Sequence, residues 1–542
     1  MSFRLLPSST MHVLEGVSST AGLLAWGFIS ILTLRVLYRW WSGTNGSGLP
    51  YPPGPKGYPV INNFFDMPMH KEWEVYRDLS KKYGDIMFFR VFNTPIMILS
   101  SQKVVLDLFE KRSAIYSARP HSVMMHDLLS MDNFFSLLTY GPWWRRHRRA
   151  FHQNFYPNAI PKYRYIITKY TSRLLVSLYN GGDMDESARN AIAGIGIRIL
   201  YGVDVKSVTD PFISDAIEVS EAFAEAATPG RFMVDNLPIL KYVPSWVPGA
   251  GFQRWAQYYK QVCLRVLDEP FNFVQLKHEK AEAVPCVATT FIDKFPEGDT
   301  QERHEEYIIA RNVVSQSHLA AVDTTHSVAC AFYLGVLTNP SIQASAQAEL
   351  DRVVGHGVVP DVSQAADLPY VSAIAKESLR WHQVLPLGFP HLVSEDHVYN
   401  GYFIPKGTIA FGNAWGMMHD PQVFDEPMSF NPEHYLRKDD TGAWELDPNA
   451  VEPNPTFGFG RRICPGRYLA FEMLFSVVAA SLAMFNILPP EDEHGNPEKL
   501  PEARFATRSA MMRPEPFRCI FKPRSAQTEA TLENLKASLP FA

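Results

Sequence analysis

One glycine-punctuated loop that carries a single cysteine constrains this 542-residue chain most strongly. Residues 457–467 read FGFGRRICPGR, and the apolar stretch 468–485 that follows predicts a helix. A sulfur in this loop lies at a helix N-terminus, where unpaired N–H groups favour negative charge and lower the pKa of a thiol. Pro465 suits a first helical position, while Gly460 and Gly466 permit a tight backbone path close to a flat ligand. The loop therefore makes Cys464 a candidate ligand-binding thiolate.

The other cysteines limit what Cys464 can bind. None of them lies within fifty residues of it, and no Cys-x-x-Cys or Cys/His cluster surrounds it, so a zinc or iron–sulfur site lacks ligands. A lone thiolate fits haem, whose porphyrin supplies four iron ligands, whereas a buried free cysteine is the usual fate of a single Cys. The loop alone leaves both interpretations open. The five scattered cysteines form no disulfide framework and fit a reducing compartment.

The spacing within the loop adds a resemblance to a known family. The pattern F-x-x-G-x-R-x-C-x-G is matched by Phe457, Gly460, Arg462, Cys464 and Gly466. It resembles the haem-binding loop of the cytochrome P-450 superfamily, the haem-thiolate monooxygenases, and the resemblance covers the chain after its first fifty residues or so. The resemblance implies a mainly α fold with a small β-rich region and haem b as cofactor. It also implies that Cys464 is the axial ligand of the haem iron and that Phe457, Arg462 and Gly466 bind the cofactor.

Helices dominate the secondary structure that the sequence predicts, with a few short strands. The predicted helices are 72–82, 141–155, 186–201, 215–227, 252–279, 304–338, 341–354 and 371–383. The predicted strands are 86–91, 94–99, 398–399 with 402–403, and 409–411.

A polar pair interrupts the longest predicted helix. Asp323 and Thr324 lie in its middle, although Asp and Thr are poor helix formers. The residues alone allow a solvent-facing Asp and a Thr that bonds back to the preceding turn. The segment AAVDTT also resembles the family motif A/G-G-x-D/E-T-T/S, with Ala321 in place of the usual glycine. The resemblance implies that Asp323 and Thr324 are catalytic and deliver protons to dioxygen at the haem.

Two further motifs concern the support of the haem loop. Glu377 and Arg380 are spaced i and i+3 on one predicted helix, and an exposed pair at this spacing is worth little. They resemble the family's E-x-x-R motif, which implies a buried structural pair that braces the loop. The segment FNPEHY matches the family's P-E-R-F region, except that His434 stands where Arg is expected. Because histidine has a shorter reach, the geometry of this structural triad is left open.

Three residues are predicted to contact the haem propionates. The run WWRRHRR resembles the family's W-x-x-x-R helix, which implies that Trp144 and Arg148 bind a propionate; a solvated basic face is the alternative. Four residues of helix bring the two onto one face, and the fork of an arginine suits a carboxylate. His391, in the segment PLGFPH, stands where the family offers a basic residue to a propionate; a surface histidine is the alternative.

The remaining cations of that helix predict a docking surface. Arg145, Arg146 and Arg149 are expected to form a basic patch with Arg461 and Arg467 that attracts an acidic redox partner. The resemblance implies that this partner is an NADPH–cytochrome P-450 reductase, which carries FAD and FMN, with cytochrome b5 as a further candidate. The net charge of −5 gives no sign of nucleic-acid binding.

The N-terminus predicts a membrane anchor. Residues 17–34 carry no charge over a length that spans a bilayer, and Arg35 and Arg39 follow them. The positive-inside rule places the catalytic domain in the cytosol, on a single-pass transmembrane helix in the endoplasmic reticulum membrane. A cleaved signal peptide is the alternative. The expected domains are the anchor (1–41), a proline-rich hinge (42–60), the catalytic domain (61–525) and a C-terminal tail (526–542).

The substrate is the least constrained feature. The resemblance implies which residues form the pocket wall, and because these are mostly apolar they predict a lipophilic small molecule. They are Met124, Leu128, Met131, Phe134, Ser317, Ala320, Leu387, Phe389 and Ser509–Met511. The sequence resembles filamentous-fungal members that tailor secondary metabolites, which implies hydroxylation of a terpenoid, with an aromatic polyketide or an indole as the alternative. A reductase-independent isomerase or dehydratase and a non-catalytic haem carrier are the other classes left open.

Overall fold

The computed structural model describes residues 24–28, 30–31, 47–494, 496–499, 502–506 and 510–539. The longer helices are α2 (Glu72–Tyr83), α5 (Pro142–Phe155), α6 (Arg164–Tyr179), α7 (Met184–Tyr201), α8 (Pro211–Ala226), α9 (Gly251–Glu279), α11 (Gln301–Thr338), α12 (Pro340–Val353), α13 (Pro369–Trp381), α15 (Arg467–Met484) and α16 (Ala526–Ser538). The shorter helices are α3 (Gln102–Val105), α4 (Ser113–Tyr116), α10 (Val287–Ile292) and α14 (Ala414–Met418). The strands are β1 (Ile86–Val91), β2 (Thr94–Leu99), β3 (His391–Leu392), β4 (His397–Tyr399), β5 (Tyr402–Ile404), β6 (Ile409–Gly412), β7 (Leu436–Lys438), β8 (Trp444–Leu446), β9 (Phe485–Leu488), β10 (Phe505–Ala506), β11 (Arg513–Pro514) and β12 (Ile520–Pro523).

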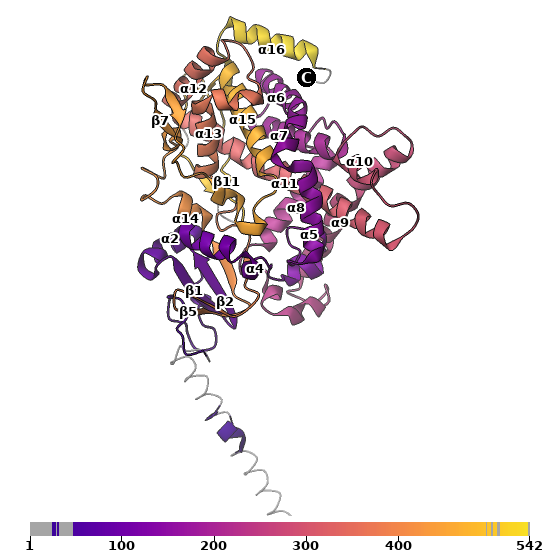
Figure 1. The fold of residues 1–542 in the computed structure, drawn as a ribbon, viewed down its shortest axis with the longest axis vertical. Helices are drawn as coiled ribbons and strands as arrows, with labels where there is room; N and C mark the ends of the chain where they lie inside the picture. Colours follow the sequence, from indigo (N-terminus) through magenta and orange to yellow (C-terminus); the bar gives the residue numbers. More distant parts are fainter. Residues whose placement is uncertain are drawn as a thin grey trace, which may run out of the picture.

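Helix α11 runs through the centre of the body (Figure 1). The side chain of Thr300 caps it by accepting a hydrogen bond from the backbone N–H of Arg303. The helix ends before Asn339, because the residue that precedes a proline disfavours the helical conformation. Helices α5, α7, α8, α9, α13 and α15 all contact α11. Its C-terminal half is buried on all sides, so it forms a wall that distant parts of the chain share.

A four-stranded sheet lies at the end of the molecule opposite α16 (Figure 1). Its strand order is β1-β2-β6-β3, with β1 antiparallel to β2, β2 parallel to β6 and β6 antiparallel to β3. Phe89 and Ile98 pack on Tyr76 of α2 on one face, whereas Met97 and Leu99 face a second core cluster. The sequence predicted β1 and β2 with the bounds that the structure gives, but it did not predict the two-residue strand β3.

Two of the longer helices, α6 and α16, were not expected from the sequence, and neither were the short helices α3, α4, α10 and α14. Helix α6 packs on α7, but it continues a 3-10 turn and has no capping side chain, so its start carries no sequence signal. The segment expected as a C-terminal tail contains α16. A capping box between Ser525 and Thr528 begins α16, and its Leu532 is fully buried.

The predicted membrane anchor lies mostly outside the described residues. Among the described helices, α11 and α15 are long and apolar enough to cross a membrane, but 78% and 72% of their most apolar windows are buried in the fold. Their apolar character therefore belongs to the protein core.

Candidate active site

A cavity of about 340 Å³ lies between α11 and the loop that precedes α15. The predicted site residues that line it are Trp144, Arg148, Thr324, His391, Phe457, Arg462, Cys464 and Gly466. These residues come from α5, α11, β3 and the loop, so the fold gathers motifs that are far apart in the sequence. The predicted residues that do not line it are Asp323, Glu377, Arg380 and His434.

Cys464 lines the cavity, and a backbone hydrogen bond of this residue closes the loop in which it lies. The N–H of Cys464 donates to the carbonyl of Phe457 at 2.7 Å, and Gly466 is the N-cap of α15. Burial raises the pKa of the Cys464 thiol, although the N–H of Gly466 and the charge of Arg148 oppose this rise. The predicted lowering of the thiol pKa is therefore wrong for the protein alone, because desolvation outweighs the helix terminus. A buried thiolate at this position requires a positive partner such as a metal ion.

Gly460 behaves as the loop pattern predicts, whereas Gly466 shows no steric requirement for glycine and Pro465 does not begin the helix. Gly460 has a φ of +57°, and a Cβ there would overlap the carbonyl oxygen of Phe109, so only glycine fits. A Cβ at Gly466 would lie 3.9 Å from the sulfur of Cys464, in ordinary contact. Pro465 lies before the N-cap of α15 and is not its first helical residue.

Three arginines line the cavity, and none of them has an acidic partner among the described residues. Within the described part of the chain, Arg119, Arg148 and Arg462 donate only to backbone carbonyls. Burial lowers their pKa values to about 9, about 10 and about 8 respectively. None of the described lining residues is acidic, and the buried Nη1 of Arg462 has no hydrogen-bond partner among the described residues. Such a cluster requires anionic groups from a bound molecule, and the two propionates of haem fit it.

No sequence motif marked Arg119 as a member of this cluster. It contacts the carbonyls of Phe389 and Pro390, which lie 270 and 271 residues further along the chain. Its role therefore follows from the fold and not from a local pattern. The buried Trp144 supports the same cluster, because the guanidinium of Arg462 lies over its ring at 4.4 Å.

His391 lies at the cavity as predicted, but not as a donor to a carboxylate. Its Nδ1 faces the carbonyl of Tyr116 at 2.7 Å, and its ring stacks on Phe109 at 4.0 Å. Nδ1 therefore carries the proton, which leaves Nε2 as an acceptor. Burial and the charges of Arg119 and Arg462 lower the pKa of His391 well below its usual value. Without a bound anion, the three arginines are the charged donors at this end of the cavity.

Asp323 and Thr324 are neighbours in sequence, but α11 turns them to different sides. Thr324 lines the cavity, and its hydroxyl donates to the carbonyl of Ala320 at 2.7 Å. The buried carboxylate of Asp323 instead binds Arg189 at 3.0 Å and also binds Arg513. Burial acts to raise the pKa of Asp323, but Arg513 and Arg189, together with His326 and the Ser220 hydroxyl, outweigh it and the pKa is lowered. The predicted acid–alcohol pair therefore makes no direct contact at the cavity.

Ser220 of α8 connects Asp323 to the cavity. Its hydroxyl donates to the carboxylate of Asp323 at 2.9 Å, and the residue lines the cavity. Because a hydroxyl both donates and accepts, Ser220 can pass a proton between the two. Sequence reasoning missed Ser220, since it lies 103 residues before its partner and in no motif.

Glu377 and Arg380 form a fully buried pair, and His434 joins it. Arg380 donates to both carboxylate oxygens of Glu377 at 2.7 Å. Nδ1 of His434 lies 3.3 Å from Glu377, and its Nε2 lies 2.7 Å from the carbonyl of Asp425. Both ring nitrogens thus face acceptors, which a doubly protonated imidazole satisfies. Histidine therefore completes this network despite its shorter reach.

The predicted pocket wall coincides only partly with the cavity. Its members that line the cavity are Met131, Phe134, Ser317, Ala320, Phe389 and Met511. Met124 does not line the cavity but is buried in a core cluster with residues of α9, and Leu128 packs on that cluster. Leu387 does not line the cavity and packs instead on the cluster that contains Trp73 and Trp415. Ser509 lies outside the described residues.

The basic face of α5 is smaller than predicted. Arg146 is bound by Glu305 and Glu306 of α11, so its charge is paired within the protein. Arg467 is partly buried and donates to the hydroxyl of Tyr468. The members of the predicted patch that stay exposed are Arg145, Arg149 and Arg461.

A lone cysteine thiol that lines a cavity with arginines suited to a dicarboxylate is typical of proteins that hold haem through a thiolate. Comparison with known proteins leads to the same class. The family model of Cytochrome P450 matches residues 52–521, and the chain belongs to this family.

Curated relatives match almost the whole chain. Cytochrome P450 monooxygenase COX1 of Coprinopsis cinerea is 40% identical over 97% of this chain and 100% of its own length. COX2 of the same fungus is 41% identical over 91% and 93% of the two chains. Tryptamine 4-monooxygenase of Psilocybe cyanescens is 37% identical over 88% and 93%. The chain is thus a monooxygenase whose family uses haem iron.

Proposed function

We propose that this protein hydroxylates a neutral, lipophilic terpenoid of fungal secondary metabolism, with electrons from NADPH through a reductase. The observation that carries this proposal is an apolar cavity whose described lining has no acidic residue. Phe223 and Phe389 contact each other at 5.4 Å on its wall. The hydroxyl of Ser317 donates a hydrogen bond to the carbonyl of Val313, so its proton is not available to a ligand in the cavity. Such a lining favours a ligand with few polar groups.

The residues of this chain have separate tasks in that reaction. Bound haem supplies the activation of dioxygen and the transfer of one oxygen atom to a C–H bond. Cys464 would bind the iron, and Arg148 and Arg462 would bind the propionates. Thr324 and Ser220 hold hydroxyl protons at the cavity, where the apolar wall excludes bulk water.

An indole is the second candidate substrate, because one relative is named Tryptamine 4-monooxygenase. An aliphatic amine such as tryptamine is a cation at neutral pH, and a buried cation requires an anionic partner. Since no described lining residue is acidic, we favour a neutral indole over a charged one within this alternative.

Feeding experiments decide between these substrates. Yeast that expresses the full chain with a cytochrome P450 reductase is given neutral terpenes, neutral indoles and tryptamine, and products are measured by mass spectrometry. We expect hydroxylated terpenes and no product from tryptamine. Efficient conversion of tryptamine would contradict the proposed neutral substrate, and turnover without reductase and NADPH would contradict the proposed electron supply.

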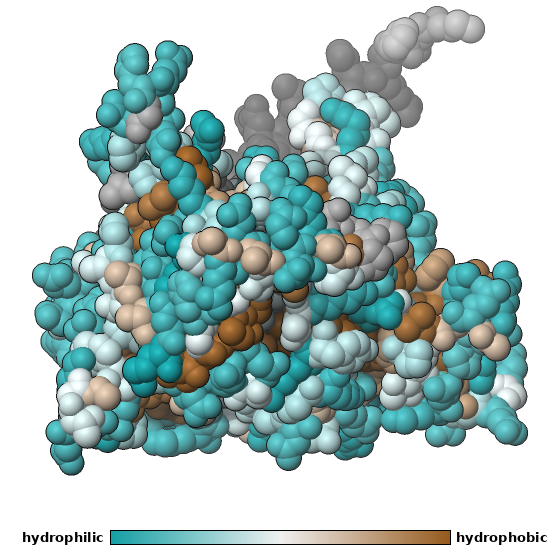
Figure 2. Space-filling model, turned by 90° about the horizontal axis from the view of Figure 1, so that it is seen from above, coloured by the Kyte–Doolittle hydropathy of each residue, from teal (hydrophilic) through white to brown (hydrophobic). Residues whose placement is uncertain are grey.

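We also propose that the protein is held at the endoplasmic reticulum membrane with its catalytic domain in the cytosol. Large hydrophobic side chains are exposed on the segment between α8 and α9, with Trp246 at 80% and Ile239 at 71%. This segment begins beside Met69, near the N-terminal end of the body, since a Cβ at Gly230 would lie 3.8 Å from Met69. The opposite end, seen in Figure 2, is mostly hydrophilic. An exposed apolar patch at this position supports contact with lipid.

Vesicle flotation tests the lipid contact separately from the anchor. A chain that starts at residue 42 is mixed with phosphatidylcholine vesicles, with and without the double substitution Ile239→Ser and Trp246→Ser. We expect the double variant to float several-fold less. Tyr165→Ser, at an exposed position on α6, is the matched control and should float like the parent chain.

A further inference from the structure

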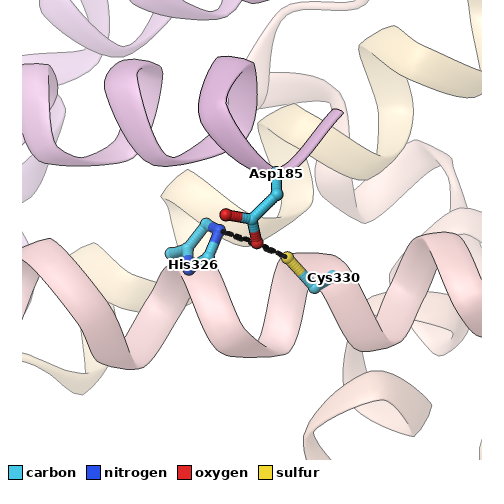
Figure 3. A group of neighbouring side chains, drawn as sticks. All are labelled: Asp185, His326 and Cys330. Atoms are coloured by element: carbon cyan, nitrogen blue, oxygen red, sulfur yellow. Dashed lines mark hydrogen bonds and ion pairs between the residues drawn. The ribbon is translucent and has the colours of Figure 1, made fainter. Parts of the chain in front are cut away.

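A second cluster of ligand-type side chains lies outside the cavity, between α7 and α11. His326 and Cys330 are spaced i and i+4 on α11, so they share the face that meets the first turn of α7, where Asp185 lies. Figure 3 shows the three side chains converging. None of the three lines the cavity described above.

The three ligand atoms form a tight triangle. Nε2 of His326 lies 3.1 Å from Oδ1 of Asp185 and 3.3 Å from the sulfur of Cys330. The sulfur lies 3.6 Å from the same carboxylate oxygen. In a tetrahedral zinc site, metal–ligand distances of about 2.3 Å for sulfur and 2.0–2.2 Å for nitrogen and oxygen place the ligand atoms roughly 3.3–3.6 Å apart. The observed triangle already has nearly this size.

We propose that Asp185, His326 and Cys330 form a binding site for a divalent cation of the zinc class. Thiolate and imidazole ligands select zinc over magnesium and calcium, which prefer oxygen. Binding exchanges the thiol proton of Cys330 for the metal and releases that proton to solvent. The thiolate and the carboxylate then balance the two positive charges.

Burial gives this site one open side. His326 and Cys330 are buried, whereas the side chain of Asp185 is 54% exposed. The cation can therefore enter past Asp185, and a water molecule can complete four-coordination on that side. The protein ligands would fix the two helices to each other.

The cluster is linked to the residues behind the active site. Arg189 lies 3.5 Å from the second oxygen of Asp185 and 3.0 Å from Asp323, so it bridges the two carboxylates. A cation on Asp185 would compete with Arg189 for that carboxylate and leave the arginine to Asp323. Asp323 in turn binds Ser220 at the cavity. Occupation of the site is thus expected to hold Asp323 more tightly and to slow proton supply, an effect that rests on the proposed function.

Zinc binding is tested on the full, haem-loaded chain. Equilibrium dialysis against Zn²⁺ with metal analysis measures stoichiometry, and X-ray absorption at the zinc edge measures the ligands without interference from haem iron. We expect one bound zinc with one sulfur at about 2.3 Å and nitrogen or oxygen neighbours at about 2.0–2.1 Å. Cys330→Ser should remove the sulfur neighbour and weaken binding at least tenfold, and the solvent-facing Asp185→Asn should weaken it without touching the core.

Cys263→Ser, a buried cysteine on α9, is the matched control and should keep both the zinc and its sulfur neighbour. Zinc coordinated by nitrogen and oxygen alone, or binding that is equal in Asp185→Asn and the parent chain, would overturn the site. The proposed effect of the cation on Asp323 is tested separately by the amount of product formed per NADPH. Zinc should lower this ratio in the parent chain but not in Asp185→Asn. An unchanged ratio with zinc bound would overturn this effect.

Discussion

Arg462 is a residue whose position makes sense only with a bound anion. Arg462 is buried, and its guanidinium lies over the ring of Trp144. Its Nη1 has no hydrogen-bond partner among the described residues. An unpaired buried charge destabilises the folded protein. A ligand that pairs with this charge removes that cost, which strengthens its binding. The adjacent Arg461 differs, because it is exposed and donates to the hydroxyl of Tyr140. Two neighbouring arginines thus have different tasks.

We expect Arg462→Gln to lose haem faster than the parent protein. A hydrogen bond to a charged group contributes about 1.5–3 kcal/mol, so haem transfer to apomyoglobin should accelerate roughly 10- to 100-fold. Arg461→Gln is the matched control and should transfer haem at the parental rate. Equal rates for the two variants would contradict the assignment of Arg462 to a propionate.

The second prediction at the residue scale concerns Ser220. Ser220→Ala removes the hydroxyl between Asp323 and the cavity, so less of the consumed NADPH should end in product and more in hydrogen peroxide. The expected loss is roughly tenfold, below the 10²–10⁴-fold of a sole acid–base group, since Thr324 remains. Product and peroxide are measured per NADPH. Ser317→Ala also changes the cavity wall, but its hydroxyl bonds within α11, so it should couple like the parent enzyme.

At the scale of elements, the arginines of α5 lie in three different environments. Arg148 faces the cavity, Arg146 is paired with α11, and Arg145 and Arg149 stay exposed. An exposed patch of one sign raises the association rate with a partner of opposite charge by about 10- to 1000-fold at low salt. The two exposed arginines therefore are the part of α5 that a reductase can meet.

We expect the double substitution Arg145→Glu and Arg149→Glu to slow reduction of the haem by a cytochrome P450 reductase. At low ionic strength the rate should fall about tenfold, and the difference should shrink with added salt. Stopped-flow absorbance in the presence of carbon monoxide measures the rate. Arg437→Glu, an exposed arginine on β7, should leave the rate unchanged; a similar loss in both variants would argue against docking on α5.

The sequence predicted elements and motifs well where one local pattern determines them. Short apolar runs predicted β1 and β2, and the cysteine loop predicted the position of Cys464 at the cavity. It missed Arg119 and Ser220, because their partners lie 270 and 103 residues away and only the fold brings them together. The sequence also could not predict the direction of the Asp323 side chain, since motif spacing does not say which side of the helix faces the cavity.

At the scale of the whole molecule, buried histidines connect stability to pH. His318, His382 and His419 are buried, and desolvation lowers their pKa values to about 4, about 3 and about 3. In the unfolded chain a histidine titrates near 6.5. Between about pH 6.5 and pH 4 the unfolded state therefore binds more protons than the folded state. Stability must fall as the pH falls through this window.

We expect the urea midpoint of the haem-loaded protein to decrease steadily from pH 6.5 to pH 4.5. Each buried neutral histidine contributes a slope of about 1.4 kcal/mol per pH unit in this range. His318→Gln should flatten the dependence by removing one such group. Tyr201→Phe removes only a hydroxyl that contacts His318 at 3.4 Å, so it should shift the midpoint without flattening the dependence. A pH dependence that is unchanged in His318→Gln would mean that other groups control the acid sensitivity of this fold.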